Sequence, residues 1–190
     1  FSSLQRLAEE SDILTFHVPL LREGSHPTFH LANADFFHRL KRKTVVMNTS
    51  RGEVVDTLAL KKALHKGLVK EAILDVWENE PTIDLDLLHY IYIGTPHIAG
   101  YSADGKANAT RQALDALCRH FQLQGHYTIT PPAPPQPEVE AATLPEALLQ
   151  IYNPHTDSQA LKNHPELFEQ IRGNYPLRRE EGAYHISIQR

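Results

Sequence analysis

The chain has 190 residues, of which 19 are basic and 23 acidic, giving a formal charge of −4 at neutral pH. Its 41% hydrophobic and 22% charged residues can form a buried core, which excludes wholesale disorder. No apolar run approaches the roughly 18 residues that cross a bilayer, so no membrane partner is expected. The mild acidity argues against nucleic-acid binding, which needs a basic surface. The single Cys118 permits no internal disulfide and predicts a cytoplasmic protein.

The beginning of the chain resembles the middle of a repeating helix–strand pattern. Ser2–Glu10 is a predicted helix with Leu4 and Leu7 on one face, and Asp12–Val18 alternates as a strand directly after it. The first residue is Phe1 rather than methionine. We therefore expect the chain to be a fragment of a longer protein.

Helices and strands continue to alternate beyond residue 30, which predicts an α/β fold with a parallel sheet and flanking helices. Apolar runs rich in β-branched residues predict strands buried on both faces. The predicted strands are Asp12–Val18, Thr44–Thr49, Ala72–Val76, Tyr90–Gly94 and Ala183–Ile188. The predicted helices are Ser2–Glu10, Asn33–Leu40, a helix from Asp56 to Gly67, Asp104–Phe121, Pro145–Tyr152 and Pro165–Ile171.

A proline-rich stretch divides the predicted domains. Residues 130–137 contain five prolines and are expected to form a stiff extended linker, although an ordinary loop is the alternative. We therefore predict an α/β domain over residues 1–129 and a small α+β domain over residues 138–190.

The last fifty or so residues are too few to be stable alone, yet they contain many apolar side chains. These are Leu144, Leu148, Leu149, Ile151, Leu161, Leu167, Phe168, Ile171, Ile186 and Ile188. A second copy of the chain would cover such a surplus, so we predict a homodimer formed through this domain. The alternative is that the segment docks on its own chain.

The segment NTSRGEVVD places Arg51 directly after a buried strand. Open α/β sheets bind ligands at the carboxyl ends of their strands, and arginine offers a planar fork of donors to a carboxylate or a carbonyl. Arg51 is therefore a candidate ligand-binding residue. A salt bridge within the loop is the alternative interpretation.

The next two strands end in the segments LDVWENEP and GTPHIAGY, which carry three acids and a histidine. Asp75 lies in an apolar run and needs a polar partner, whereas Glu78 is interpreted as a solvated loop acid. A histidine beside a glutamate can stay protonated at neutral pH and act as a general acid. Three successive strands would bring Arg51, Glu80 and His97 to one edge of the sheet.

These three segments, in this order, resemble those of the D-isomer-specific 2-hydroxyacid dehydrogenases, as does the segment HVPL at His17–Leu20. The resemblance covers nearly the whole chain and implies a partial Rossmann-like sheet. Within the family, HIAGYSADGKANAT, IYNPHTD and NYPLRRE are most similar to a member that acts on a small phosphorylated hydroxy acid and pairs through its C-terminal domain.

The resemblance implies catalytic roles for three residues. Arg51 matches the arginine that orients the substrate, Glu80 the acid that supports the histidine, and His97 the residue that transfers a proton. In this role Arg51 would bind the substrate carboxylate and polarise the reacting carbonyl.

The resemblance also implies NAD as cofactor. Thr49, Ser50, Arg51, Asp75 and Gly100 match cofactor-contacting positions, with Asp75 facing the nicotinamide carboxamide. Tyr101, like Arg51, matches a substrate-binding position.

The glycine-rich phosphate loop of the family has no counterpart here, because none of the nine glycines forms a G-x-G-x-x-G pattern. We expect that loop, and contacts to the substrate phosphate, to lie upstream of residue 1, and the fragment alone to be inactive. A generic 2-hydroxyacid or phosphoglycerate dehydrogenase and a non-catalytic NAD-sensing scaffold are the alternatives.

The chain has twelve histidines, but they are scattered and predict no metal site. Surface or helix-end positions are expected for His26, His30, His38, His65, His120, His126 and His164.

Overall fold

The structure is a computed structural model that describes residues 2–125 and 127–189, so His126 lies outside the described residues. The chain forms two compact units. The first contains the residues up to His97 together with Pro154–Asn174, and the second contains Ile98–Asn153 and the residues from Tyr175 onward. This division differs from the predicted ranges 1–129, 130–137 and 138–190, because Pro154–Asn174 packs within the first unit.

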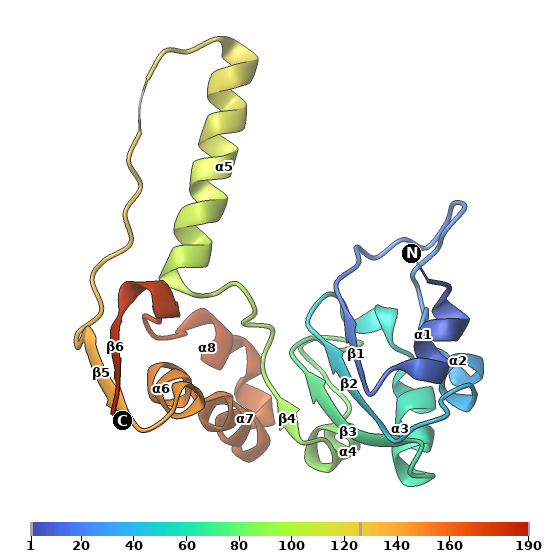
Figure 1. Cartoon of the computed structure of the whole chain (residues 1–190). Coiled ribbons are helices and arrows are strands. Elements are labelled where there is room, and N and C mark those ends of the chain that lie inside the picture. The colour runs from blue at the N-terminus through green and yellow to red at the C-terminus, as the bar shows by residue number, and fades with distance from the viewer. Residues whose placement is uncertain (1, 126, 190) are drawn as a thin grey trace. The chain divides into compact units, whose positions relative to one another are not determined.

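The first unit is built on a four-stranded sheet with the order β1-β2-β3-β4 (Figure 1). All neighbouring strands are parallel, as the alternation of helices and strands predicts. The strands are β1 (Ile13–Phe16), β2 (Thr44–Asn48), β3 (Val69–Leu74) and β4 (Ile93–Gly94).

The strands end in one row across the sheet. Phe16 is paired with Asn48, Asn48 with Leu74, and Leu74 with Gly94. Each of these residues is the last in its strand, so the four following loops all leave from the same edge. The register therefore places the segments that carry the candidate site residues side by side.

Helices in the first unit begin where short polar side chains cap them. Ser3, Asn33, Asp56 and Asp84 each accept a hydrogen bond from a backbone N–H three residues further on. The helices are α1 (Leu4–Glu10), α2 (Ala34–His38), α3 (Thr57–His65), α4 (Leu85–Tyr90), α7 (Pro154–Asn163) and α8 (Phe168–Gly173), with 3₁₀ turns η1 (Gly52–Val54) and η2 (Pro165–Leu167).

Two of these helices, α4 and α7, were not predicted from the sequence. The predicted strand Tyr90–Gly94 is reduced to Ile93–Gly94, because Asp84 caps α4 and the buried Leu87 and Leu88 hold that helix through Tyr90. The helix α7 was not predicted, and its Ser158 hydroxyl accepts a hydrogen bond from the backbone N–H of Gly94 at 3.1 Å.

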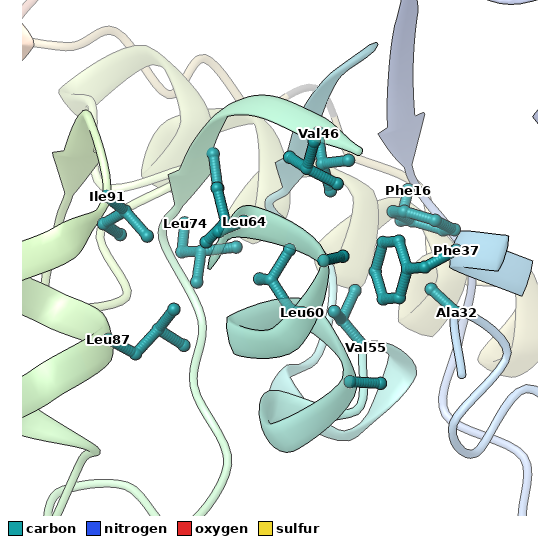
Figure 2. Close-up of a cluster of buried hydrophobic side chains, with 14 of the residues drawn as sticks. Phe16, Ala32, Phe37, Val46, Val55, Leu60, Leu64, Leu74, Leu87 and Ile91 are labelled. Atoms are coloured by element: carbon teal, nitrogen blue, oxygen red, sulfur yellow. The ribbon is translucent and has the colours of Figure 1, made fainter. Parts of the chain in front are cut away.

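One hydrophobic core fills the first unit, and Figure 2 shows part of it gathered around α3. Leu60 and Leu64 of this helix lie among side chains of the sheet and of α4, including Leu74 and Leu87. Leu161 and Phe168 belong to the same core and are fully buried. The expectation that these two residues form part of an uncovered apolar surplus is therefore wrong, since their own chain covers them.

The second unit contains a long helix and a small two-stranded sheet. Its elements are α5 (Ala103–Phe121), β5 (Glu138–Ala141), α6 (Leu144–Ile151), η3 (Glu181–Ala183) and β6 (His185–Ile188). The two strands are parallel, with Val139 opposite Ile186, and Figure 1 shows them side by side. The strand β6 is predicted from its alternation, whereas β5 was not predicted.

The beginning of α5 is tied to the C-terminal segment of the same unit. Ser102 caps the helix by accepting a hydrogen bond from the N–H of Gly105, and its hydroxyl donates to Glu180 at 2.7 Å. Asp104 accepts two hydrogen bonds from the Arg179 guanidinium at 2.9 Å, which lowers the pKa of this carboxyl below its ordinary value. Residues far apart in sequence therefore fix the start of the helix.

No helix in the described part of the chain combines the length and the apolar character needed to span a membrane.

We predict that Leu60→Ala lowers the free energy of unfolding by about 2 to 5 kcal/mol, because it leaves a cavity in the core. Leu58 on the same helix is 65% exposed, so Leu58→Ala is the matched control and should change stability by less than about 0.5 kcal/mol. Urea unfolding of both variants measures the difference. Equal losses for the two variants would contradict the described packing of α3.

Candidate active site

The loop after β2 is organised by the buried side chain of Asn48. Its amide nitrogen donates to the carbonyl of Arg51 at 2.9 Å, and its amide oxygen accepts hydrogen bonds from both the N–H and the hydroxyl of Ser50. The Arg51 side chain is exposed, and its guanidinium donates to the carbonyl of Ser50 at 2.6 Å. The loop is thus fixed by local hydrogen bonds while its cation faces outward.

The backbones of the loops after β2 and β3 touch at Gly52. A Cβ atom added to this glycine would lie 2.0 Å from the carbonyl carbon and oxygen of Trp77, a distance that no side chain tolerates. The buried Trp77 indole in turn donates to the carbonyl of Thr95, after β4, at 2.9 Å. Gly52 and Trp77 therefore connect the loops that follow β2, β3 and β4.

His97 and Glu80 form a hydrogen-bonded pair. The distance between His97 Nδ1 and Glu80 Oε2 is 2.7 Å, and the two side chains are 24% and 19% exposed. The other carboxylate oxygen of Glu80 accepts from the N–H of Trp77 at 2.8 Å, which fixes the acid. A carboxylate accepts hydrogen bonds, so the tautomer with the proton on Nδ1 satisfies this contact and leaves Nε2 as the ring nitrogen that the contact with Glu80 does not use.

Asp75 is the buried acid at the end of β3. It is 4% exposed, and its carboxylate accepts a hydrogen bond from the hydroxyl of Thr95 at 2.6 Å. Its backbone carbonyl also accepts from the N–H of His97 at 2.7 Å. Asp75 therefore has the polar partner that its apolar surroundings require, and it links the loops after β3 and β4.

Glu78 is not the solvated loop acid that the sequence suggests, and His30 is not a simple surface histidine. Glu78 accepts from His30 Nε2 at 2.7 Å and from the N–H of Thr57 at 2.9 Å, and its side chain is only 19% exposed. Burial raises the pKa of Glu78, but the hydrogen bonds from His30 and Thr57 outweigh burial and hold it below its ordinary value. The 48-residue separation of this pair hides it from local sequence reasoning.

A pocket of about 470 Å³ opens at this edge of the sheet. It brings together the predicted catalytic residues Arg51, Glu80 and His97. Its lining residues are Arg22, Phe29, Arg51, Gly52, Glu53, Trp77, Glu78, Asn79, Glu80 and His97. Arg22 and Phe29 were not singled out from the sequence, although they closely follow the segment HVPL.

The remaining predicted site residues lie outside this lining. Thr49 and Ser50 are half-buried at the end of β2, beside Arg51. Gly100 and Tyr101 belong to the second unit, where Gly100 has a φ of 84° and the N–H of Tyr101 donates to the carbonyl of Ile98 at 2.9 Å. Among the described residues, no three histidine, cysteine or acidic side chains are grouped as metal ligands.

Comparison with known proteins identifies the family. Residues 1–99 match the family model described as "D-isomer specific 2-hydroxyacid dehydrogenase, NAD binding domain". The chain therefore belongs to the D-isomer-specific 2-hydroxyacid dehydrogenase family, and the predicted fold class and the predicted cofactor NAD are confirmed.

Curated relatives and a solved structure agree with this assignment. An erythronate-4-phosphate dehydrogenase of Bacteroides fragilis is 61% identical over 99% of the chain, and one of Porphyromonas gingivalis is 40% identical over 98%. The chain spans about half the length of these relatives, 54% and 53% respectively. The crystal structure of apo D-mandelate dehydrogenase from Rhodotorula graminis matches 70% of this chain and 39% of its own, at 29% identity and a TM-score of 0.57.

The residues at the carboxyl edge have the chemistry that a nicotinamide cofactor requires. The Asp75 carboxylate is an acceptor suited to the N–H groups of a carboxamide, and the hydroxyl groups of Thr49 and Ser50 lie on the neighbouring loop. Dinucleotides bind at this edge of open parallel sheets. The residues present therefore fit one end of the cofactor.

We predict that Glu78→Gln destabilises the protein by about 1 kcal/mol at neutral pH, because a charged hydrogen-bond acceptor is lost. The folded pKa of Glu78 is lowered, so its contribution is present above the unfolded glutamate pKa of about 4.3 and is lost as the pH falls through the folded value. Unfolding of both proteins measured at a series of pH values tests this. A difference that stays constant from neutral pH to about pH 3 would contradict the assignment.

Proposed function

We propose that the full-length protein containing this chain is an NAD-dependent dehydrogenase that oxidises 4-phospho-D-erythronate to 2-oxo-3-hydroxy-4-phosphobutanoate. This reaction belongs to the synthesis of pyridoxal phosphate, in the cytoplasm. The names of the relatives support the substrate, and the family supports the reaction class. The observation that carries the proposal is that Arg51, Glu80 and His97 line the same pocket, with His97 held by Glu80 at 2.7 Å.

Three side chains of the pocket perform the acid–base and binding steps. Arg51 binds the substrate carboxylate with its exposed guanidinium and thereby orients the C2 hydroxyl. His97 removes the hydroxyl proton through Nε2, and the Glu80 carboxylate stabilises the imidazolium that forms. In the reverse direction the protonated His97 returns this proton while Arg51 polarises the carbonyl.

When bound, NAD supplies the acceptor for the hydride that leaves C2 of the substrate. Thr49, Ser50, Arg51, Asp75 and Gly100 are the residues of this chain that would hold the cofactor. Asp75, whose carboxylate accepts from Thr95, would accept a hydrogen bond from the nicotinamide carboxamide. Tyr101 is the further residue that would contact the substrate.

We also propose that the protein forms a homodimer through the second unit. Leu144 and Leu149 on α6 are 53% and 52% exposed, and Ile188 on β6 is 43% exposed. Among the described residues, β5 and β6 pair only with each other, which leaves one edge of each strand without a partner strand. Exposed apolar side chains and open sheet edges in one unit are suited to a self-complementary contact between two copies.

We predict that His97→Ala in the full-length protein lowers kcat by roughly 10²- to 10⁴-fold, the usual contribution of a general acid–base group. Arg51→Ala should lower kcat and raise KM, because the arginine acts on both bound substrate and transition state. NADH formation from 4-phospho-D-erythronate measures both effects. His120→Ala is the matched control, since His120 is exposed on α5 and should leave the rate unchanged.

The same assay separates the alternatives. Turnover of another acid, such as D-3-phosphoglycerate or D-lactate, but not of 4-phospho-D-erythronate would favour a generic 2-hydroxyacid dehydrogenase. Cofactor binding without turnover of any acid would favour a non-catalytic scaffold. A His97→Ala variant with wild-type kcat, where hydride transfer limits the rate, would contradict the proton-transfer role.

We predict that the double variant Leu144→Asp with Leu149→Asp shifts the full-length protein from dimer to monomer, because it places charges on the apolar surface of α6. Sedimentation velocity at matched concentrations measures this shift. Leu58→Asp is the control, because Leu58 is an even more exposed leucine, at 65%, and belongs to the first unit. A monomeric wild-type protein, or a double variant that stays dimeric, would contradict the proposal.

A further inference from the structure

A loop beside the candidate active site has a rigid base. The buried hydroxyl of Thr28 donates to the carbonyl of Pro19 at 2.6 Å and accepts from the N–H of Leu21 at 2.8 Å. The N–H groups of Thr28 and Phe29 both donate to the carbonyl of Leu21, at 2.8 and 3.1 Å. These bonds close the loop and place Arg22, just after Leu21, opposite Phe29.

Arg22 is the first of a row of contacting side chains that reaches the acids lining the pocket. The carbon of its guanidinium lies 4.6 Å from the centre of the Phe29 ring, and Phe29 is stacked on His30 with 4.0 Å between ring centres. His30 is in turn held by Glu78 at 2.7 Å. This cation–π contact helps to position the Arg22 guanidinium without a hydrogen bond to Phe29.

The charges around Arg22 leave it available to an anion. Glu78 and Glu80, two of the acids lining the pocket, are already hydrogen-bonded to histidines. The third, Glu53, meets the Arg22 guanidinium at a long distance of 3.3 Å, with side chains 31% and 60% exposed respectively. Within residues 2–125 and 127–189, this is the one hydrogen bond that the Arg22 guanidinium makes. Such an exposed pair is weak and can be exchanged for a stronger anion.

The pocket therefore contains two arginines, Arg22 and Arg51, on different loops. A phosphorylated hydroxy acid carries two anionic groups, a carboxylate next to the reacting carbon and a phosphate at the other end. We propose that Arg22 binds the phosphate while Arg51 binds the carboxylate, so that Arg22 selects phosphorylated substrates. This inference rests on the proposed function and assigns a phosphate contact to a residue of this chain.

Binding of phosphate in place of Glu53 is favourable for two reasons. A phosphate dianion offers more charge and more acceptor oxygens to the guanidinium fork than one carboxylate does. Glu53 remains partly exposed, so its carboxylate can be solvated once Arg22 is released. Glu53 then acts as a temporary partner that keeps Arg22 in position when no substrate is bound.

The test compares two acids that differ only in the phosphate. In the full-length protein, kcat/KM is measured for 4-phospho-D-erythronate and for D-erythronate, in wild type and in Arg22→Ala. We expect Arg22→Ala to lower kcat/KM roughly 10- to 100-fold for the phosphorylated acid, the usual effect of one charged hydrogen-bond donor, and less than about threefold for D-erythronate. Arg42→Ala is the matched control, because Arg42 pairs with Asp12 at the opposite end of β2. Thermal melting verifies that each variant is folded.

Equal losses for the two acids, or no loss for either, would overturn the role of Arg22 in reading the phosphate. If the wild-type protein oxidises neither acid, the proposed substrate is wrong, and calorimetric titration with inorganic phosphate then decides the role of Arg22. Loss of phosphate affinity in Arg22→Ala but not in Arg42→Ala would support the site. Unchanged affinity in Arg22→Ala would overturn it.

Discussion

The register of the parallel sheet is the constraint on which the site depends. Because Phe16, Asn48, Leu74 and Gly94 form one row of paired residues at the ends of their strands, each following loop begins at the same edge. A slip of one residue in any strand would turn its side chains to the other face and move its loop. The core fixes this register, since buried side chains such as Val46 leave no alternative pairing.

Direct contacts between the loops then convert a shared edge into a defined site. Gly52 packs against the Trp77 backbone, and the Trp77 indole extends the connection to Thr95. The hydrogen-bonded side chains of His97 and Glu80 also join the loops that follow β3 and β4. Preorganised groups of this kind need little reorganisation during a reaction, which is the physical basis for assigning the chemistry to this edge.

Local features of the fold were predictable from the sequence, whereas tertiary pairings were not. Ser3, Asn33 and Asp56 cap helices where short polar residues precede apolar periodicity, and the buried strands follow from their β-branched runs. The His30–Glu78 pair joins residues that no local pattern connects, so both were interpreted as solvent-exposed. Leu161 lies in α7, a helix that was not predicted, and only the three-dimensional packing reveals which unit covers it. The edge carrying Arg51, Glu80 and His97 was predictable because topology alone determines it, while Arg22 depends on the closure of a loop.

The proposed function requires that His97 Nε2 and the Arg51 guanidinium act on the same substrate molecule. A crystal structure of the full-length protein with its 2-oxo acid product bound would show whether they do. We expect the product carboxylate to be hydrogen-bonded to Arg51 and its C2 oxygen to lie within hydrogen-bond distance of His97 Nε2. A product whose C2 oxygen faces a different donor, with His97 still bonded to Glu80, would contradict this expectation.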